Sequence, residues 1–498
     1  LIWCSCSGRL TRESLPCAYD DLNLGCVVIY LPCTLIRVHD MTQPNSSSQS
    51  VLWIKKPQAI YTANQQDASN GVLIKDNTII ELVATGCQPT LPYDQVFDAS
   101  NHVVMPGMVN THHHFYQTLT RACPPALNKK LFPWLQTLYP IWAQLTPEQH
   151  EIATELAMVE LLLSGCTTVS DHHYLFPQSL SQGIDQQVNV ARKLGMRATF
   201  TRGSMSLGKD QGGLPPMSVV QSEQTIMDDS ERLIKNYHQK DDLIEIALAP
   251  CSPFSVTQDL MKSTAQLAKQ YDVNIHTHLA ETEDENQFCL DMFGLRPLDY
   301  LDSVGWMHDK TWLAHGIHFN DEEIRRLGES RVGICHCPSS NMVLASGICR
   351  VNELKAAGVR VGLGVDGSAS NDHSNLMQEV RQALLIQRLR YEADEFTHLD
   401  ALELATAGSA QVLNRGDIGQ LAVGMKADIS LYKLDEPRFS GSHDPLAAMV
   451  LCGAYKADAV MINGQWKVKD SEWLEGDLAE LMAKHTHAAK TLFKSAGY

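Results

Sequence analysis

The chain has 498 residues, 44% of them hydrophobic and 19% charged, which is typical of a globular enzyme and excludes a disordered or fibrous protein. Its formal net charge of −17 argues against nucleic acid or an anionic membrane as a partner, because phosphate binding requires clustered Lys and Arg. No apolar run reaches the ~20 residues that span a bilayer, and the scattered cysteines favour reduced thiols in the cytoplasm.

The first forty residues differ in character from the rest of the sequence. They lack an initiating Met and the pattern of a secretory signal, whereas Met41 precedes a Ser/Gln/Asn-rich stretch and the strand-like run 51–54. We therefore expect residues 1–40 to be a non-native upstream extension, with translation starting at Met41. A genuine N-terminal extension is the alternative, and the mass of the natural protein distinguishes the two.

Short β-type runs separated by turn residues occur near both ends of the chain. The first group comprises 51–54, 59–62, 71–74 and 78–83, and the second comprises 428–432, 459–462 and 465–468. Asn463-Gly464 lies between the last two runs and is a strong hairpin signal. We expect residues 41–104 and 416–475 to pair into one small β-sandwich domain, followed by a C-terminal helix within 476–498.

Residues 105–415 alternate strands with helices such as 147–164, where Pro147 suits a first helical turn and Gly165 a helix end. The candidate strands are 108–114, 167–171, 197–202, 244–250, 273–278, 311–315, 331–336 and 360–366. Alternation of this kind predicts a parallel sheet, and eight strands predict closure into a barrel. The expected fold is α/β: a (β/α)8 TIM-like barrel carrying the β-sandwich domain.

Residue types that bind metals fall at the ends of these strands. His112 and His114 lie two apart at the end of the first strand, His278 ends the fifth and Asp366 ends the eighth. Three imidazoles and one carboxylate are sufficient to hold zinc with a position left for water. An isolated His-x-His is often structural, but four such residues at the carboxyl ends of barrel strands, where active sites form, predict a metal site.

Further titratable residues near strand ends are candidates for proton transfer. Glu281 follows His278 by three residues and is predicted to be a proton shuttle, with a helix N-terminal glutamate as the alternative. His315 ends the sixth strand and is predicted to hold the attacking water or a developing oxyanion, with a core histidine as the alternative. His276 either supports the ligands or is structural, and His172, His173 and His336 are candidates for the pocket lining.

Four separated motifs carry a resemblance to a known family. They are Met105-Pro-Gly-Met-Val-Asn-Thr-His-His-His, His278-Leu-Ala-Glu281, Leu363-Gly-Val-Asp366-Gly and the segment 419–429. Over residues 51–475 the chain resembles the amidohydrolase superfamily, within its group of single-metal deaminases and triazine hydrolases. The resemblance implies zinc, or iron as in some relatives, on the four predicted ligands. The fourth strand has no Lys to bridge two ions, which favours one metal per chain.

Within that group, segments 110–121, 138–142 and 202–216 are most similar to the 8-oxoguanine deaminases. Many relatives carry a substrate-binding His where Cys251 stands here, which indicates a differently shaped base. Gln117 and Arg202 are candidate partners for ring carbonyls or nitrogens, with scaffold or salt-bridge roles as the alternative. The sequence is also compatible with a homo-oligomer.

The resemblance implies that the substrate is a heterocyclic base and that the reaction converts 8-oxoguanine to urate and ammonia. Zinc would lower the pKa of its water from roughly 16 toward ~7. Asp366 would accept the water's proton, Glu281 would protonate the ring, and His315 would stabilise the new oxygen. Guanine, isocytosine or an aminotriazine, including a chlorohydrolase reaction, is the alternative within this chemistry. A two-metal cyclic amidase and a non-catalytic barrel are the alternatives outside it.

Overall fold

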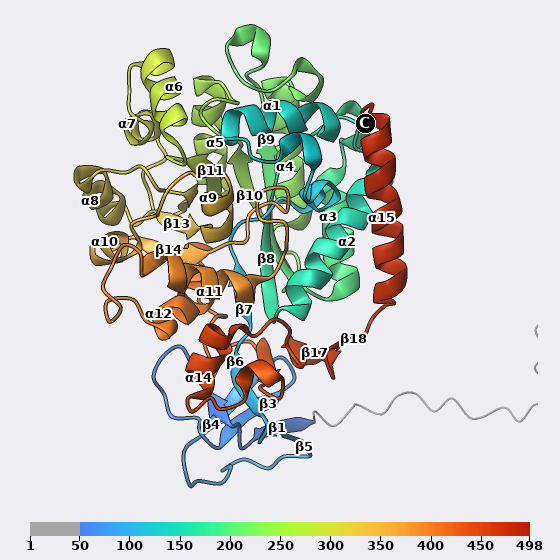
Figure 1. Cartoon of the computed structure of the whole chain (residues 1–498), viewed down its shortest axis with the longest axis vertical. Coiled ribbons are helices and arrows are strands. Elements are labelled where there is room, and N and C mark those ends of the chain that lie inside the picture. Colours follow the sequence, from blue (N-terminus) through green and yellow to red (C-terminus); the bar gives the residue numbers. More distant parts are fainter. Residues whose placement is uncertain (1–49) are drawn as a thin grey trace, which may run out of the picture. The chain divides into compact units, whose positions relative to one another are not determined.

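Eight parallel strands lie side by side in chain order in the structure, a computed structural model that describes residues 50–498 (Figure 1). They are β7 (Met108–Asn110), β8 (Cys166–His173), β9 (Arg197–Ser204), β10 (Ile244–Pro250), β11 (Ile275–Leu279), β12 (Thr311–His315), β13 (Gly333–His336) and β14 (Arg360–Leu363). The backbone amide of Thr111 donates to the carbonyl oxygen of Leu363 at 3.1 Å, so the first and last strands meet and nearly close the barrel. The predicted TIM-like fold is confirmed. The expectation for residues 1–40 lies outside the described residues.

The first and eighth strands are shorter than predicted. β7 ends at Asn110 and β14 at Leu363, so His112, His114 and Asp366 lie just beyond the strands. Asp366 has a φ of 62°, which is a left-handed conformation outside the range of regular β-strands. His114 directly precedes a 3₁₀ helix, Phe115–Thr120, which bends the chain away from the barrel axis. The predicted fourth and sixth strands agree with β10 and β12 in both bounds.

Helices surround the barrel on its outside (Figure 1). They are α2 (Pro147–Leu163), α3 (Gly183–Leu194), α4 (Glu223–Tyr237), α5 (Gln258–Tyr271), α6 (Glu283–Phe293), α7 (Pro297–Ser303), α8 (Asp321–Glu329), α9 (Pro338–Val343), α10 (Val351–Ala356), α11 (Leu376–Gln387), α12 (His398–Glu403) and α13 (Ser409–Val412). α2 begins as predicted, with Pro147 in its first turn and a reciprocal capping box between Thr146 and Gln149. Gly165 follows the helix end with a φ of 95°, a conformation that is unfavourable for residues with a side chain.

Two mixed sheets lie at the ends of the described chain, the first built from residues 51–98 alone and the second from segments of both ends. One sheet has the order β4 (Thr78–Val83), β3 (Gly71–Lys75), β1 (Val51–Lys55), β5 (Gln95–Asp98). The other has the order β18 (Glu472–Trp473), β17 (Gln465–Lys469), β16 (Ala459–Ile462), β15 (Ile429–Lys433), β6 (His102–Pro106), β2 (Ala59–Ile60). The antiparallel pair β15–β6 joins the two ends of the sequence. Ile54 and Val72 of the first sheet share an apolar core with Leu431 and Met461 of the second, so the sheets pack as a sandwich.

The predicted hairpin at Asn463-Gly464 is confirmed, because both residues adopt the positive φ, 55° and 74°, that a tight turn between β16 and β17 requires. The short helix α14 (Pro445–Ala448) lies in the connection between β15 and β16. The last element, α15 (Leu478–Ser495), runs alongside α2 (Figure 1). Its His485 ring nitrogen Nε2 lies 3.0 Å from Thr118 Oγ1, which ties the C-terminal helix to the 3₁₀ helix that follows His114.

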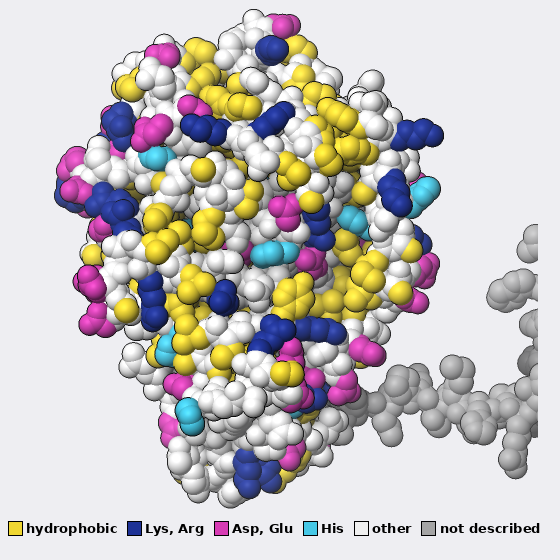
Figure 2. Space-filling model, viewed as in Figure 1, with side chains coloured by type: hydrophobic (Ala, Val, Ile, Leu, Met, Phe, Trp, Pro, Cys, Tyr) yellow, Lys and Arg dark blue, Asp and Glu magenta, His cyan; other side chains and the backbone are white. Residues whose placement is uncertain are grey.

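The surface charge and the polarity of the helices are consistent with the expectations drawn from the composition. Figure 2 shows basic and acidic side chains interspersed across one face of the molecule rather than gathered into a block of one sign. Among residues 50–498, no helix is both long and apolar enough to cross a membrane. The cysteines of the same residues are all free thiols.

Candidate active site

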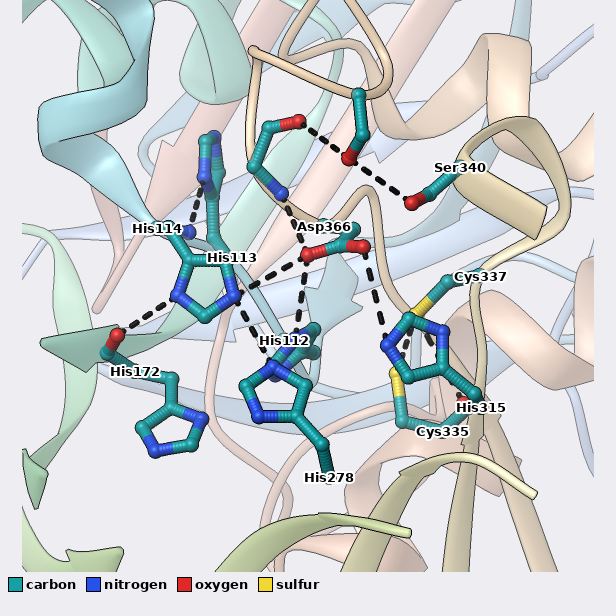
Figure 3. Close-up of polar contacts among 12 residues, drawn as sticks. His112, His113, His114, His172, His278, His315, Cys335, Cys337, Ser340 and Asp366 are labelled. Carbon is teal, nitrogen blue, oxygen red and sulfur yellow. Dashed lines mark hydrogen bonds and ion pairs between the residues drawn. The ribbon is translucent and has the colours of Figure 1, made fainter. Parts of the chain in front are cut away.

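The four predicted metal ligands converge at the carboxyl end of the barrel (Figure 3). Asp366 Oδ1 lies 3.2 Å from His112 Nε2 and 3.3 Å from His114 Nε2. His114 Nε2 lies 3.2 Å from His278 Nε2. All four side chains are buried. Two overlapping groups are compact enough to hold a metal ion: His112, His114, His172 and His278, and His112, His315 and Asp366. The assignment of His112, His114, His278 and Asp366 as the ligands stays a prediction.

Backbone carbonyls fix the orientation of two of these rings. His114 Nδ1 lies 2.7 Å from the carbonyl oxygen of His172, and His278 Nδ1 lies 2.6 Å from that of Cys251. Because a carbonyl oxygen only accepts, each Nδ1 carries the proton. Burial lowers the pKa of His278 well below its usual range, so its ring is neutral and its Nε2 is a lone pair. His114 Nε2 faces this lone pair at 3.2 Å, and a cation between the two nitrogens would bind to both.

His112 completes the set of donors that a metal requires. Its Nδ1 lies 2.8 Å from His276 Nε2, whereas its own Nε2 faces Asp366 Oδ1 at 3.2 Å without the geometry of a hydrogen bond and has no other polar partner within residues 50–498. A buried polar atom without a partner costs ~1–3 kcal/mol. Neutral imidazoles and a carboxylate are the ligands of zinc and of similar divalent ions. This nitrogen and the facing Nε2 atoms of His114 and His278 fit a metal ion.

The two predicted proton-transfer residues stand beside this cluster. His315 Nε2 lies 3.5 Å from Glu281 Oε2 and 3.9 Å from Asp366 Oδ2. Burial, and then the charge of Asp366, raise the pKa of Glu281 to about 8. Glu281 is therefore protonated at neutral pH and is able to donate a proton. His315 Nδ1 lies 3.0 Å from the side-chain oxygen of Asn341, which holds the ring in place.

A pocket with about 370 Å³ of space, including its open mouth, adjoins the cluster. Helix α1 (Leu131–Trp142) forms one wall. Besides His114, His278, Glu281, His315 and Asp366, the pocket is lined by Gln117, Leu131, Trp134, Leu135, Tyr139, Tyr174, Cys251, Phe254, Leu344 and Ser370. An aromatic and aliphatic lining next to a few converging polar groups suits a flat, partly polar ligand.

Two predicted substrate-binding residues lie in this pocket. Gln117 packs its carboxamide against Gly367, where a Cβ atom would clash with it. The side-chain oxygen of Gln117 is buried and has no partner among the described residues, so it is free to accept a hydrogen bond from a ligand. Burial raises the pKa of Cys251 to about 12, so this residue contributes a neutral thiol.

Comparison with known proteins agrees with this geometry. The amidohydrolase family matches residues 103–467, which is well over half of the chain. The chain belongs to the amidohydrolase family.

Three relatives of this amidohydrolase are informative. The 8-oxoguanine deaminase of Pseudomonas aeruginosa is 62% identical over 443 residues, covering 88% of this chain and 98% of that protein. An isoxanthopterin deaminase from an unknown prokaryotic organism is 31% identical, covering 82% and 90%. Among solved structures, the atrazine chlorohydrolase of Arthrobacter aurescens TC1, complexed with zinc, has a TM-score of 0.82 and 29% identity, covering 88% of this chain and 100% of that chain.

The amidohydrolase does not bring Arg202 into the pocket lining. The guanidinium Nε donates to Asp229 Oδ2 at 2.7 Å, and a terminal nitrogen donates to the side-chain oxygen of Gln221 at 3.0 Å. The guanidinium also stacks over the Phe176 ring, 3.9 Å from its centroid. This buried arrangement matches the alternative that the sequence left open for Arg202, a salt bridge within the scaffold.

Some of the other histidines of the amidohydrolase contact the predicted metal ligands, whereas others lie away from the pocket. His172 supplies the carbonyl that holds His114, and its ring stacks on His278 with centroids 4.7 Å apart. His113 Nε2 lies 2.8 Å from Ser374 Oγ, and His113 Nδ1 accepts a hydrogen bond from the backbone amide of His114 at 2.7 Å. His173 and His336 are absent from the lining: His173 packs against His150, and His336 lies 3.3 Å from Gln387.

Sequence reasoning missed Glu285 and the aromatic wall of α1. The carboxylate of Glu285 accepts hydrogen bonds from the backbone amides of Ala280, at 3.0 Å, and Glu281, at 2.9 Å. Thr282-Glu-Asp-Glu285 has the Thr-x-x-Glu pattern of a helix start, and Thr282 does cap α6, but the pattern does not predict that Glu285 binds the amides of Ala280 and Glu281. Tyr139 and Trp134 lie in an apolar run, and the side of this run that faces the pocket is set by packing alone.

Proposed function

We propose that this amidohydrolase is a deaminase that uses one zinc ion to hydrolyse 8-oxoguanine to urate and ammonia. The observation that carries the proposal is the convergence of the Nε2 atoms of His112, His114 and His278 with the Asp366 carboxylate, next to the buried carboxyl group of Glu281. The identity of 62% to an 8-oxoguanine deaminase, against 31% to the isoxanthopterin deaminase, supports the choice of base. The zinc in the atrazine chlorohydrolase structure supports the choice of metal.

Zinc is proposed to bind to His112, His114, His278 and Asp366. When bound there, it supplies a water molecule acidic enough to attack at neutral pH. The second carboxylate oxygen of Asp366 faces His315 rather than the imidazole cluster and is placed to accept the proton of that water. β10 carries no Lys that could bridge a second ion, which supports a single metal.

Glu281 is proposed to protonate the ring nitrogen next to the carbon that carries the amino group. This removes the negative charge that would otherwise build up in the ring as the water oxygen attacks. His315 lies within 4 Å of both carboxyl groups and is placed to hydrogen-bond the incoming oxygen. The proton held by Asp366 then passes to the amino group, the carbon–nitrogen bond breaks and ammonia leaves. The hydroxyl proton on the ring carbon returns to the Glu281 carboxylate as the new carbonyl forms. Each general acid or base of this kind contributes ~10²–10⁴-fold in rate.

The pocket supports a flat oxidised purine as the substrate. Trp134, Tyr139, Tyr174 and Phe254 provide aromatic surface for a ring system. The unpaired carboxamide oxygen of Gln117 is proposed to accept a ring N–H. Cys251, with its neutral thiol, occupies less space than the imidazole that stands there in many relatives, and we propose that it also contacts the base.

Steady-state ammonia release by the zinc-loaded protein tests the proposal. We expect the highest kcat/KM with 8-oxoguanine and lower values with guanine, isocytosine and an aminotriazine. A higher kcat/KM for one of those bases would overturn the assigned substrate, and no ammonia from any of them would overturn the deaminase. Metal analysis should give one zinc per chain; two ions per chain would instead favour the cyclic amidase.

A further inference from the structure

His276 lies on β11, two residues before His278, and among residues 50–498 its hydrogen bond to a predicted metal ligand is the one to His112. Both rings are fully buried. His276 Nε2 lies 2.8 Å from His112 Nδ1, and His276 Nδ1 lies 2.9 Å from the backbone carbonyl oxygen of Trp312. His276 and Trp312 are register partners on the neighbouring strands β11 and β12, so the sheet itself sets this contact.

The carbonyl of Trp312 decides the direction of the whole chain of hydrogen bonds. Because that oxygen only accepts, His276 Nδ1 carries a proton. The ring is fully buried, and neither of its nitrogens contacts a carboxylate among the described residues, so a second proton would leave an unpaired buried charge. It follows that the ring holds one proton. His276 Nε2 is therefore a lone pair and must accept from His112 Nδ1–H. His112 is left with a lone pair on Nε2, the atom that faces the other proposed ligand Asp366 at 3.2 Å.

Trp312 supports the same arrangement with its side chain. Its indole ring stacks on the His276 ring, with centroids 4.3 Å apart and an interplanar angle of 13°. Its indole Nε1 donates at 3.2 Å to the backbone carbonyl of Thr111, the residue directly before His112 in the chain. Trp312 thus holds His276 in place and fixes the backbone that carries His112.

We propose that His276 is a positioning residue that fixes His112 in the tautomer able to bind the metal. The inference rests on the proposed function, since it takes His112 as a metal ligand. His114 and His278 are oriented by backbone carbonyls, whereas His112 has only His276 as its Nδ1 partner. An imidazole acceptor, unlike a carbonyl, accepts at Nε2 only while its own proton is held at Nδ1. Loss of such supporting partners lowers metal affinity by ~10–100-fold.

Two substitutions of His276 distinguish the effect of its hydrogen-bond acceptor from the effect of its ring shape. His276→Phe keeps a flat ring against Trp312 but removes the acceptor, and we expect zinc affinity to fall about 10–100-fold in competition with a chelator. His276→Gln offers an amide oxygen to His112 Nδ1–H, and we expect an affinity closer to that of the wild type. His150→Phe is the matched control, because His150 is a buried histidine bonded to Gln186 and lies outside the site.

The nitrogen chemical shifts of His112 in the metal-free wild type provide a readout that does not depend on any variant. We expect the proton on Nδ1. A proton on Nε2, or a His276→Phe affinity equal to that of the His150→Phe control, would overturn the inference. Failure of the wild-type protein to bind zinc would overturn the proposed function instead, so the two results are distinguishable.

Discussion

Glu281 Oε2 and His315 Nε2 lie 3.5 Å apart. Glu281 follows β11 directly after Ala280, which has a positive φ, and His315 ends β12 with a positive φ of its own. Ala280 has a φ of 55°, His315 of 73° and Asp366 of 62°. A non-glycine residue rarely adopts this conformation, and such residues concentrate at active sites. The left-handed residues turn the chain at the ends of β11, β12 and β14, which directs the three side chains toward one another.

Glu281→Gln removes the proposed proton donor with little change in shape. We expect kcat to fall ~10²–10⁴-fold, because the amide does not release a proton to the base. Zinc content should stay at the wild-type level, since Glu281 lies outside the proposed ligand set. Ammonia release and metal analysis on the same sample check both expectations. Equal loss of zinc and activity would indicate that Glu281 acts on the metal site rather than on the substrate.

The activity should depend on pH through Glu281. Burial raises the pKa of its carboxyl from 4.5 to about 8, so the donating form is present below that pH and is lost above it. We expect kcat/KM to fall above about pH 8, and we expect Glu281→Gln to lack this fall. The unfolded chain ionises this carboxyl near its ordinary pKa, so its contribution to the free energy of unfolding is full below about pH 4.5 and is lost as pH rises toward 8. Denaturation of wild type and variant across that range measures the contribution.

Glu285→Gln should impair catalysis without removing the metal. The carboxylate accepts from the amides of Ala280 and Glu281, and the variant places an NH2 group against one of these donors. We expect a loss of ~1–3 kcal/mol in the free energy of unfolding and a fall in kcat of up to ~10²-fold from displacement of Glu281. Glu283→Gln is the control, because Glu283 lies on the same helix but is largely exposed. This variant should keep the wild-type free energy of unfolding and the wild-type kcat. An unchanged kcat with reduced stability would limit Glu285 to a structural role.

Arg202→Met should reduce stability and leave substrate binding unchanged. Arg202 is buried against Asp229, which keeps a second partner, Arg232, at 2.8 Å. We therefore expect a loss of about 2–3 kcal/mol, below the ~3–5 kcal/mol typical of breaking a buried pair. Arg192→Met removes a partly exposed pair with Asp241 and should change stability by at most ~1 kcal/mol. A raised KM at full stability would restore Arg202 as a substrate-binding residue.

The sequence predicted the fold well where local patterns carry the information. The strands β10 and β12 and the start of α2 follow from alternating apolar runs and from a capping residue with Pro147. The ends of β7 and β14 were placed too late, because the left-handed turn at Asp366 and the 3₁₀ helix after His114 form only when the loop packs. Strand ends are decided by such contacts rather than by the residues in the strand.

The sequence by itself determined which chemical groups gather at the rim of the barrel, because parallel strands in chain order bring their carboxyl ends to one face whatever the packing details are. Only the tertiary structure decided what each group does there. Arg202 points to Asp229, Glu285 holds the chain at Glu281, and the Trp312 carbonyl sets the proton on His276 and hence on His112. These roles depend on contacts between side chains and carbonyls of different strands, and such contacts leave no pattern in a single sequence.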